Sequence, residues 1–331
     1  MDERSHLMSI IAQSRAFWEA RILLTAAELD VFEPVLKTEK TAEAVAQELN
    51  ADARGTEMLL DAVASLGLLD KKKGKFRVRP GYEKFLAKSS PETILPLLMH
   101  MAHLWDRWGR LTDIVCKGAE DVMGAPGERD EESLNAFIGA MHALGRRMAD
   151  EVVSRLDLKG RKKLIDVGGG SGVYTIALLK AAPQMRATVF DYPAVIKIAE
   201  KKLAEEKLSD RVELVRGNFY KDALPSGHDL ALLSAIIHQN SRKQNVDLYR
   251  KVYDALVPGG MIVIRDYVMN EEHTQPPDGA FFAINMLVNT EGGGTYSFSE
   301  ISEDLHNAGF REAKLLHHAE MDSLVTAQKT Q

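Results

Sequence analysis

Short apolar runs alternate with amphipathic segments through the second half of the chain. The runs have the length of buried strands, and the segments between them repeat their apolar residues at helical intervals. Strands that alternate with helices predict a parallel, doubly wound α/β sheet covered by helices on both faces. The strands are predicted at 163–167, 187–191, 212–215, 229–233 and 261–266.

The first half of the chain carries the helical period instead. Three helical segments over residues 14–65 precede a short strand, a basic turn and a second short strand that ends near residue 80. Three helices followed by such a hairpin predict a winged helix. A long apolar helix is predicted at 92–116, a polar connecting loop at 117–132, and another helix at 133–157.

Composition limits the class of protein. The 331 residues are 45% hydrophobic and 27% charged with a formal net charge of −6, which is typical of a globular protein and argues mildly against a nucleic-acid partner. Cys116 is the single cysteine, so no intrachain disulfide can form and a reducing compartment is expected. The start lacks the apolar core of a signal peptide, and no apolar run approaches the ~20 residues of a membrane span. We expect a cytoplasmic protein with no membrane partner.

The basic turn of the hairpin raises the question of DNA contact. It carries four lysines between Lys71 and Lys75, but the helix before it offers Arg54 as its one cation. A helix that reads a DNA groove normally clusters several cations. The turn is therefore interpreted as a solvated wing, with no nucleic acid as partner.

A glycine-rich stretch, "LIDVGGGSGVYT", follows the first predicted strand of the sheet. Glycine allows close approach to the main chain, and ligands of doubly wound sheets bind at the carboxyl ends of strands. The spacing is Gly168-x-Gly170-x-Gly172 after Asp166, and Val173 stands at the third glycine position of a dinucleotide fingerprint. A dinucleotide cofactor is therefore disfavoured.

The next two strands favour S-adenosylmethionine (SAM) as the cofactor. The strand "ATVFD" ends in Asp191, an acid placed to accept hydrogen bonds from two ribose hydroxyls. The following strand leads to Asn218 and Phe219, which are suited to the edge and face of an adenine. The amino-acid end of the cofactor would then lie against the bare backbone of the glycine turn.

The stretches "DVGGGSG", "FDYP", "GNFY", "LLSAIIH", "LVPGGMIVIRD" and "GGGTYSFSEISEDLHNAGF" together resemble the SAM-dependent O-methyltransferase family. That family includes the plant caffeic acid type, the vertebrate hydroxyindole type and bacterial relatives. The resemblance implies a Rossmann-like class I methyltransferase fold, a homodimer formed through an N-terminal winged-helix domain, and no metal. It implies a dimerisation domain at 1–90, a helical connector at 91–155 that contributes to the substrate pocket, and a SAM-binding domain at 156–331.

The resemblance also assigns roles to residues. The expected cofactor-binding residues are Asp166, Gly168, Gly170, Asp191, Asn218, Phe219 and Ser234. Asn218 replaces the usual acid, and Ser234 stands where plant members often have a lysine. His238 occupies the position of the general base, which suits a residue whose pKa lies near neutrality. Of the two acids that hold the base and the acceptor, the first falls on Asp266 and the second is replaced by Thr295.

Substrate contacts are expected from an apolar, methionine-lined pocket, because thioethers adapt to the shape of planar acceptors. His100, His103 and Asp106 share a helical face, but without cysteine or an H-E-x-x-H pattern no metal site is predicted. The candidate substrate residues are Trp105, Phe137, Met141, Asn285, Met286, Asn289 and Thr290.

The sequence thus predicts an O-methyltransferase that acts on a small, hydroxylated, aromatic molecule and releases S-adenosylhomocysteine (SAH). The alternatives are a C- or N-methyltransferase on the same fold, a SAM-binding winged-helix regulator, and a dimeric scaffold without activity, the last suggested by the missing second acid.

Overall fold

The computed structural model describes residues 3–118 and 131–330. These residues form two compact units. The first contains residues up to 105 together with 135–143, and the second contains the remaining described residues. The three-part division at residues 90 and 155 stays a prediction.

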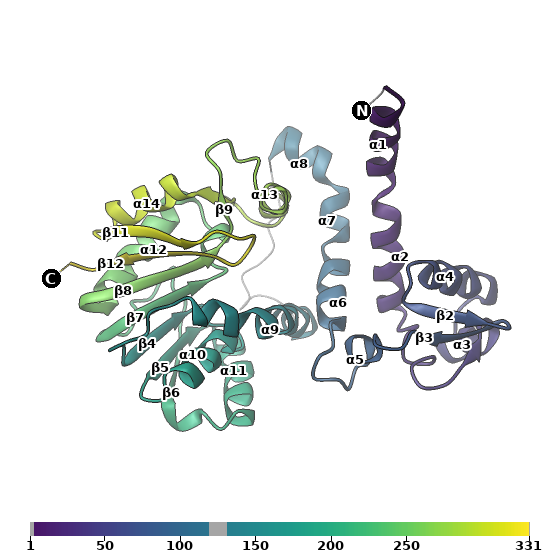
Figure 1. Ribbon diagram of the computed structural model, residues 1–331, viewed down its shortest axis with the longest axis horizontal. Helices are drawn as coiled ribbons and strands as arrows, with labels where there is room; N and C mark the ends of the chain where they lie inside the picture. Colours follow the sequence, from purple (N-terminus) through teal and green to yellow (C-terminus); the bar gives the residue numbers. More distant parts are fainter. Residues whose placement is uncertain (1–2, 119–130, 331) are drawn as a thin grey trace. The chain divides into compact units, whose positions relative to one another are not determined.

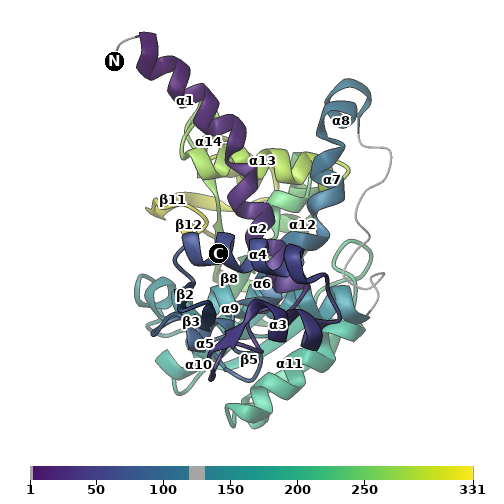
Figure 2. The same cartoon turned by 90° about the vertical axis from the view of Figure 1, so that its right-hand side faces the viewer.

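The first unit is mainly helical and contains a small three-stranded antiparallel sheet in the order β1-β3-β2. α1 and α2 run on almost as one rod, interrupted at Ala16 (Figure 2). Side chains from α2, α3, α4 and the sheet bury a common core around Phe32, Leu60 and Phe76. Its elements are α1 (Glu3–Arg15), α2 (Phe17–Glu28), β1 (Lys40–Thr41), α3 (Ala42–Leu49), α4 (Ala53–Ser65), β2 (Leu69–Lys72), β3 (Lys75–Val78), α5 (Glu83–Leu86) and α6 (Leu95–His103).

Capping side chains explain where two of these helices begin. The Thr41 hydroxyl accepts a hydrogen bond from the Ala44 amide at 3.3 Å, and the Asp52 carboxylate accepts one from the Gly55 amide at 2.7 Å. Each satisfies a backbone donor that lacks a partner in the first helical turn. Asn50 ends α3 in the left-handed conformation, which asparagine tolerates.

The prediction of one long helix at 92–116 is wrong in part. The segment begins at Leu95 and is divided at Leu104 and Arg110 into α6, α7 (Trp105–Gly109) and α8 (Leu111–Lys117). Continuous apolar periodicity hides such breaks, because a single non-helical residue does not change the pattern. Most of the predicted loop at 117–132 lies outside the described residues, and the next helix, α9 (Glu131–Ser154), begins two residues before its predicted start and ends three residues before its predicted end.

The second unit is built on a seven-stranded sheet in the order β11-β12-β8-β7-β4-β5-β6. The five adjacent strands from β8 to β6 are parallel and match the five predicted strands. They are β4 (Lys163–Val167), β5 (Arg186–Asp191), β6 (Val212–Arg216), β7 (His228–Ser234) and β8 (Leu256–Asp266). The doubly wound α/β fold is confirmed.

Side chains alternate between the two faces of this sheet. Leu164 and Val189 point to the face covered by α9, α10 (Val173–Ala181) and α11 (Pro193–Glu205). Ile165 and Phe190, one residue further along, point to the face covered by α12 (Arg242–Ala255) and α14 (Phe298–Asn307). Figure 1 shows α10 and α11 on one side of the sheet, with α12 and α14 on the other.

The sequence analysis did not predict the strands after β8. β11 (Arg311–His317) pairs antiparallel with β12 (Ser323–Gln328), and β12 pairs antiparallel with β8. A short parallel pair joins β9 (Val268–Met269) to β10 (Tyr296–Ser297), and α13 (Pro277–Asn289) lies between them in the chain. Two short 3₁₀ helices, η2 (Ser209–Arg211) and η3 (Ile237–Gln239), complete the unit. No helix within 3–118 or 131–330 is long and apolar enough to cross a membrane.

Arg211 joins the end of α10 to the start of β6. Its guanidinium donates to the carbonyl oxygens of Leu179, Ala182 and Met185 at 2.8–3.2 Å. These carbonyls lie at or beyond the last turn of α10, where helices leave acceptors without partners.

We therefore predict that Arg211→Ala lowers the free energy of unfolding by about 1.5–3 kcal/mol, the usual contribution of a hydrogen bond to a charged group. Urea titration of the purified variant measures this change. Arg250→Ala is the matched control, because Arg250 forms an exposed ion pair with Asp247 and its loss is expected to cost less than ~1 kcal/mol. Equal effects of the two substitutions would contradict the capping role.

Candidate active site

The polar residues predicted for the site lie at one edge of the sheet. β4, β5, β7 and β8 are parallel neighbours, so their carboxyl ends share this edge. The glycine turn follows β4, Asp191 ends β5, and Ser234 and Asp266 end β7 and β8. The topology therefore brings together residues that are a hundred positions apart in the sequence.

Two glycines of the turn lie where a Cβ would overlap a neighbouring side chain. A Cβ at Gly168 would lie 2.4 Å from Cδ1 of Ile236, and one at Gly169 would lie 2.9 Å from the Asp166 carboxyl carbon. Gly168 and Gly170 both have a positive φ, of +70° and +59°, but a Cβ at Gly170 would meet no atom within 4 Å. The backbone at Gly170 thus faces open space, and the turn has room for a ligand there.

Asp191 is held at the end of β5 by two backbone donors. Its carboxylate accepts hydrogen bonds from the amides of Gly170 at 2.8 Å and Tyr192 at 2.7 Å. Burial outweighs these bonds and raises the pKa of Asp191 to about 6. A carboxylate has about four acceptor sites, so the side chain retains acceptors for ribose hydroxyls. The residues present therefore fit the adenosine part of SAM.

Asp166, the residue two positions before Gly168, is buried at the end of β4. Its carboxylate accepts a hydrogen bond from the Thr175 hydroxyl at 2.6 Å, and burial raises its pKa to about 6. This bond ties the end of β4 to the first turn of α10. The hydrogen bond to Thr175 therefore stabilises the glycine turn between β4 and α10. The role of Asp166 in cofactor binding stays a prediction.

The predicted adenine residues follow β6. Phe219 is buried and its ring lies 4.5 Å from that of Tyr220. The Asn218 side-chain oxygen already accepts a hydrogen bond from the Tyr220 amide at 2.9 Å, so an adenine amino group would share this oxygen. Ser234 receives a hydrogen bond of 3.3 Å from Arg265 on the neighbouring strand.

His238 and Asp266 form a direct pair. Nδ1 of His238 lies 2.9 and 3.0 Å from the two carboxylate oxygens of Asp266, whose side chain is 1% exposed. The edge of the His238 ring meets the Phe282 ring at 4.8 Å. Because Nδ1 is engaged, Nε2 is the ring nitrogen left for an external partner. The sequence analysis did not predict Phe282, although it shares a helical face with Met286 on α13.

Hydrogen bonds from distant segments fix the loop around His238. The Asn240 side chain accepts from the Tyr220 hydroxyl at 2.5 Å and donates to Asn245 at 2.9 Å. Asn245 donates to the Ile237 carbonyl oxygen, and the Tyr296 hydroxyl donates to the carbonyl oxygen of Asn240. No sequence pattern indicated this network.

The glycine run at 292–294 packs against the backbone of the same loop. The Gly294 amide donates to the carbonyl oxygen of His238 at 2.8 Å, and a Cβ at Gly293 would lie 2.4 Å from that oxygen. Thr295, which replaces the second acid, is buried and donates to the carbonyl oxygen of Gly279 at 3.2 Å. Its hydroxyl therefore supports α13.

Several candidate substrate residues lie on α13. Met286 is buried, and Asn285 accepts a hydrogen bond from Nε1 of Trp108 at 3.1 Å. Asn289 donates to Asn285, while its own side-chain oxygen is buried without a partner in the described structure. Thr290 donates to the carbonyl oxygen of Met286 at 2.7 Å. Thr290 thus ends the helix, and Asn289 retains a free acceptor.

Trp105, Phe137 and Met141 belong to the first unit. The Arg21 guanidinium lies 5.2 Å from the centre of the Trp105 ring, and Phe137 packs edge-on against His100 at 5.3 Å. Met141 is half-buried on α9. Among the described residues, no group of three or more histidine, cysteine or acidic side chains is placed to hold a metal ion.

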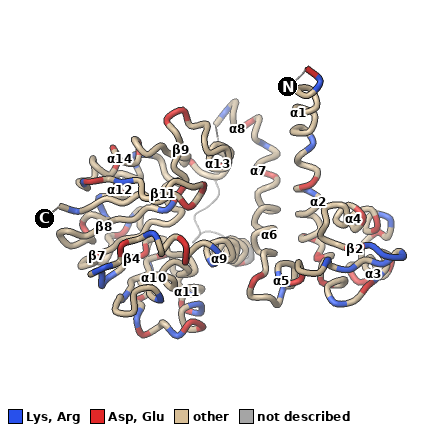
Figure 3. Tube along the Cα trace, viewed as in Figure 1, with Lys and Arg blue, Asp and Glu red and all other residues tan. Residues whose placement is uncertain are grey.

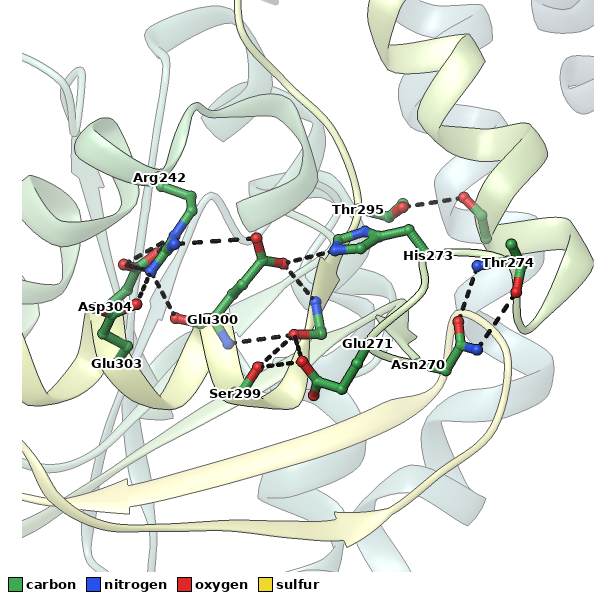
Figure 4. A network of polar contacts seen from close by, with 12 residues as sticks. Arg242, Asn270, Glu271, His273, Thr274, Thr295, Ser299, Glu300, Glu303 and Asp304 are labelled. Atoms are coloured by element: carbon green, nitrogen blue, oxygen red, sulfur yellow. Dashed lines mark hydrogen bonds and ion pairs between the residues drawn. The ribbon is translucent and has the colours of Figure 1, made fainter.

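A charged network supports the segment that leads into α13 (Figure 4). Arg242, at the start of α12, donates to Asp304 at 2.7 Å and to Glu303 at 2.7 Å on α14. Glu300 of α14 lies 3.2 Å from His273, which belongs to the segment between β9 and α13. Glu271 of that segment accepts hydrogen bonds from Ser297 and Ser299. The loop of His238 and the approach to α13 are therefore joined through α14.

Comparisons with known proteins agree with this geometry. A family model described as an O-methyltransferase domain matches residues 108–311, and one described as an O-methyltransferase dimerisation domain matches residues 12–84. The 3-hydroxy-5-methyl-1-naphthoate 3-O-methyltransferase of Streptomyces sahachiroi is 30% identical over 91% of this chain and 89% of its own length. The L-tyrosine C(3)-methyltransferase of Streptomyces lavendulae is 29% identical over 87% and 82%. The solved structure of human N-acetylserotonin methyltransferase in complex with SAM superimposes with a TM-score of 0.85, at 26% identity over 100% and 99% of the two chains.

The raised pKa of Asp191 predicts a pH dependence of cofactor binding. The ionised carboxylate is the form that accepts from hydroxyls, so SAH affinity is expected to fall by ~10-fold as the pH is lowered from 7 to 5, through the folded-state pKa. Asp191→Asn is expected to bind SAH more weakly at pH 7 by about 1–3 kcal/mol and to lose this pH dependence.

Isothermal titration calorimetry across this pH range measures both effects. Any pH dependence that remains in the variant reports Asp166, whose carboxyl group titrates in the same range. Full affinity in Asp191→Asn at pH 7 would remove Asp191 from the cofactor site.

Proposed function

The chain belongs to the SAM-dependent O-methyltransferase family, and we propose that it transfers a methyl group to a hydroxyl of a small aromatic acceptor with His238 as the general base. The observation that carries this proposal is the buried Asp266 carboxylate bonded to Nδ1 of His238. It leaves Nε2 as the nitrogen that takes the acceptor proton.

The roles of the two residues follow from their chemistry. SAM supplies a methyl group on a sulfonium that is already activated toward displacement. His238 positions the acceptor hydroxyl and removes its proton, and Asp266 fixes the orientation of the ring and stabilises the imidazolium that forms. The Phe282 ring against His238 limits the motion of the imidazole.

The acceptor is proposed to be aromatic because of the side chains on α13. Phe282 lies against both His238 and Tyr267, with ring centres 4.8 and 5.0 Å apart, and Met286 follows one helical turn later. Aromatic and thioether side chains favour contact with a flat ring. The unpartnered oxygen of Asn289 suits an acceptor that carries a second hydrogen-bond donor. The names of the naphthoate and acetylserotonin relatives also refer to aromatic molecules.

Carbon methylation is a second candidate reaction. A relative named L-tyrosine C(3)-methyltransferase shares 29% identity with this chain, and Thr295 provides no carboxylate at the position of the second acid. Nuclear magnetic resonance of the methylated product separates the two reactions, because a methoxy group and a ring methyl group have distinct carbon shifts.

A homodimer is proposed from the apolar surface of the first helices. α1 has no buried residue, and large hydrophobic side chains on α1 and α2 are more than half exposed: Leu7, Met8, Ile10, Phe17 and Trp18. An apolar surface of this kind marks an association site. The matching dimerisation model spans residues 12–84, which supports a second copy of this chain as the partner.

The hairpin β2–β3 is interpreted as a solvated wing of a winged helix. Figure 3 shows basic residues gathered at β2 and β3. Lys71 pairs with Asp61 at 2.6 Å on α4, and this hydrogen bond raises its pKa. Acids on the helix before the wing oppose DNA contact. We place the protein in the cytoplasm, where its single exposed thiol, Cys116, stays reduced.

His238→Ala is expected to lower turnover by ~10²–10⁴-fold, the usual contribution of a positioned base, with SAH affinity unchanged. The measurement is methyl transfer from labelled SAM to a panel of hydroxylated aromatics.

Asp266→Asn is expected to give a smaller loss of turnover, because Asp266 acts through His238. Thermal melts accompany both variants, and His238→Gln replaces His238→Ala if the alanine variant unfolds. Full turnover in a folded His238 variant would contradict the base assignment.

Ile10→Asp combined with Trp18→Asp is expected to convert the dimer to a monomer, because two charges would be buried in an apolar contact. Sedimentation velocity at micromolar concentration measures the state. Leu316→Asp, at a 45% exposed position on β11, is the matched control. A monomeric wild-type protein would refute the proposed dimer.

A further inference from the structure

A second polar cluster lies at the carboxyl edge of the sheet, on the face opposite His238. It consists of Tyr174, Ser234, Arg265 and Asp322, and we call it the Tyr174 cluster. Side chains alternate along β8, with Val263 in the core beneath α9 and α10 and Ile264 in the core beneath α12 and α14. Arg265 therefore points toward α10, and Asp266 toward the other face.

The Tyr174 hydroxyl is buried without a hydrogen-bond partner in the described structure. Tyr174 is 7% exposed and stands two residues after Gly172, in the first turn of α10. Burial raises its pKa to about 12, so it is a neutral donor at working pH. Buried hydroxyls nearly always have partners, and the residues within 3–118 and 131–330 supply none here.

Arg265 stacks over the same tyrosine. Its guanidinium carbon lies 4.9 Å from the centre of the Tyr174 ring, and the residue is 5% exposed. Nε donates to Asp322 at 2.6 Å, and one terminal nitrogen donates to Ser234 at 3.3 Å. A guanidinium has five N–H donors in a planar fork suited to a carboxylate.

The acidic partner of Arg265 also borders a cavity of about 310 Å³. Asp322, Glu151 and Glu320 line this cavity together with Arg155. The cluster itself thus presents a cation and a hydroxyl donor together with the Asp322 carboxylate. This arrangement of charges complements a zwitterion better than a simple anion.

We propose that the Tyr174 cluster binds the zwitterionic amino-acid end of the cofactor, with the Tyr174 hydroxyl and Arg265 on its carboxylate and Asp322 on its ammonium group. The inference rests on the proposed function. Along the sheet order β8-β7-β4-β5, Ser234 lies two strands from Asp191, which is about 10 Å at the usual strand spacing. A ligand anchored by its ribose at Asp191 extends across the glycine turn toward the cluster. Arg265 supplies from β8 the cation that plant members carry at the position of Ser234.

A purely structural role for the cluster has a different signature. The Arg265–Asp322 pair would then join β8 to the segment before β12, and the Tyr174 hydroxyl would have no partner in any state. Its removal would leave ligand affinity unchanged.

The test compares two ligands on one conservative variant, Tyr174→Phe, in the full-length protein. SAH carries the amino-acid end, and 5′-methylthioadenosine lacks it. We expect Tyr174→Phe to weaken SAH binding by ~10-fold or more, the range for a hydrogen bond to a charged group, and to leave methylthioadenosine binding unchanged. The melting temperature of the ligand-free variant is expected to equal or exceed that of the wild type. Calorimetry and thermal melts measure these quantities without turnover.

Arg265→Lys is the second variant, because it keeps the charge and loses the planar fork. It is expected to lower the ratio of SAH to methylthioadenosine affinity in the same direction. Tyr253→Phe is the matched control, because Tyr253 packs against Phe310 on the other face of the sheet, and its ratio is expected to stay at the wild-type value. An unchanged ratio in Tyr174→Phe overturns this inference. Failure of the wild type to bind either ligand refutes the proposed function itself.

Discussion

Parallel pairing of β4, β5, β7 and β8 is the constraint on which the rest of the protein depends. Each strand is hydrogen-bonded in register with its neighbour, so the polar residues after the strands are held at one edge with the spacing of the sheet. A shift of one residue would exchange the faces of every side chain in a strand. It would place Asp266 on the face of Arg265 and separate it from His238. The apolar alternation of the strands thus also fixes the geometry of the site.

The burial of two carboxylates at the same edge of the sheet lowers the stability of the fold at neutral pH. Asp166 and Asp191 have pKa values raised by burial to about 6, above the value for an unfolded chain. Between pH 4 and 6 the folded state binds more protons than the unfolded state, so the stabilising contribution of these groups falls as the pH rises. At neutral pH both carboxylates are ionised and destabilise the fold. Backbone donors at Gly170 and Tyr192 offset part of this cost for Asp191.

The sequence predicted those parts of the fold that have a local signal. The five parallel strands were located within a few residues, apart from the early start of β8. Four of them have neighbours on both sides in the sheet and are nearly continuous apolar runs, whereas the edge strand β6 is half-exposed. β11 was missed because most of its residues are exposed, so it lacks such a run. The breaks at Leu104 and Arg110 escaped prediction because each interrupts the helix at a single residue and leaves the apolar periodicity intact.

The residues of the candidate site also divide into those with a local sequence signal, which were predicted, and those without one, which were not. Asp191, His238 and Asp266 follow strands, so their shared edge was predictable from topology together with the family resemblance. Phe282, Tyr220 and Tyr296 were not predicted, because their roles depend on contacts between segments 20 to 56 residues apart. Asn289 was predicted as a candidate substrate residue. That its side-chain oxygen has no partner in the described structure could not be predicted, because it depends on tertiary contacts such as the hydrogen bond from Trp108 to Asn285. Local pattern therefore locates the candidate site residues, and tertiary contacts supply the groups that hold them.

The bonds of Asn240 have a consequence for the redesign of this protein. Its side chain must accept from Tyr220 and donate to Asn245, while its backbone accepts from Tyr296. Aspartate at this position would place an oxygen against the side-chain oxygen of Asn245. An aliphatic residue would leave both Tyr220 and Asn245 without their hydrogen bond to position 240. We therefore expect substitutions at position 240 to be poorly tolerated, although it lies only two residues from His238. Variation aimed at the proposed acceptor pocket therefore belongs at Met286 on α13 rather than at Phe282, because the Phe282 ring packs against the His238 ring.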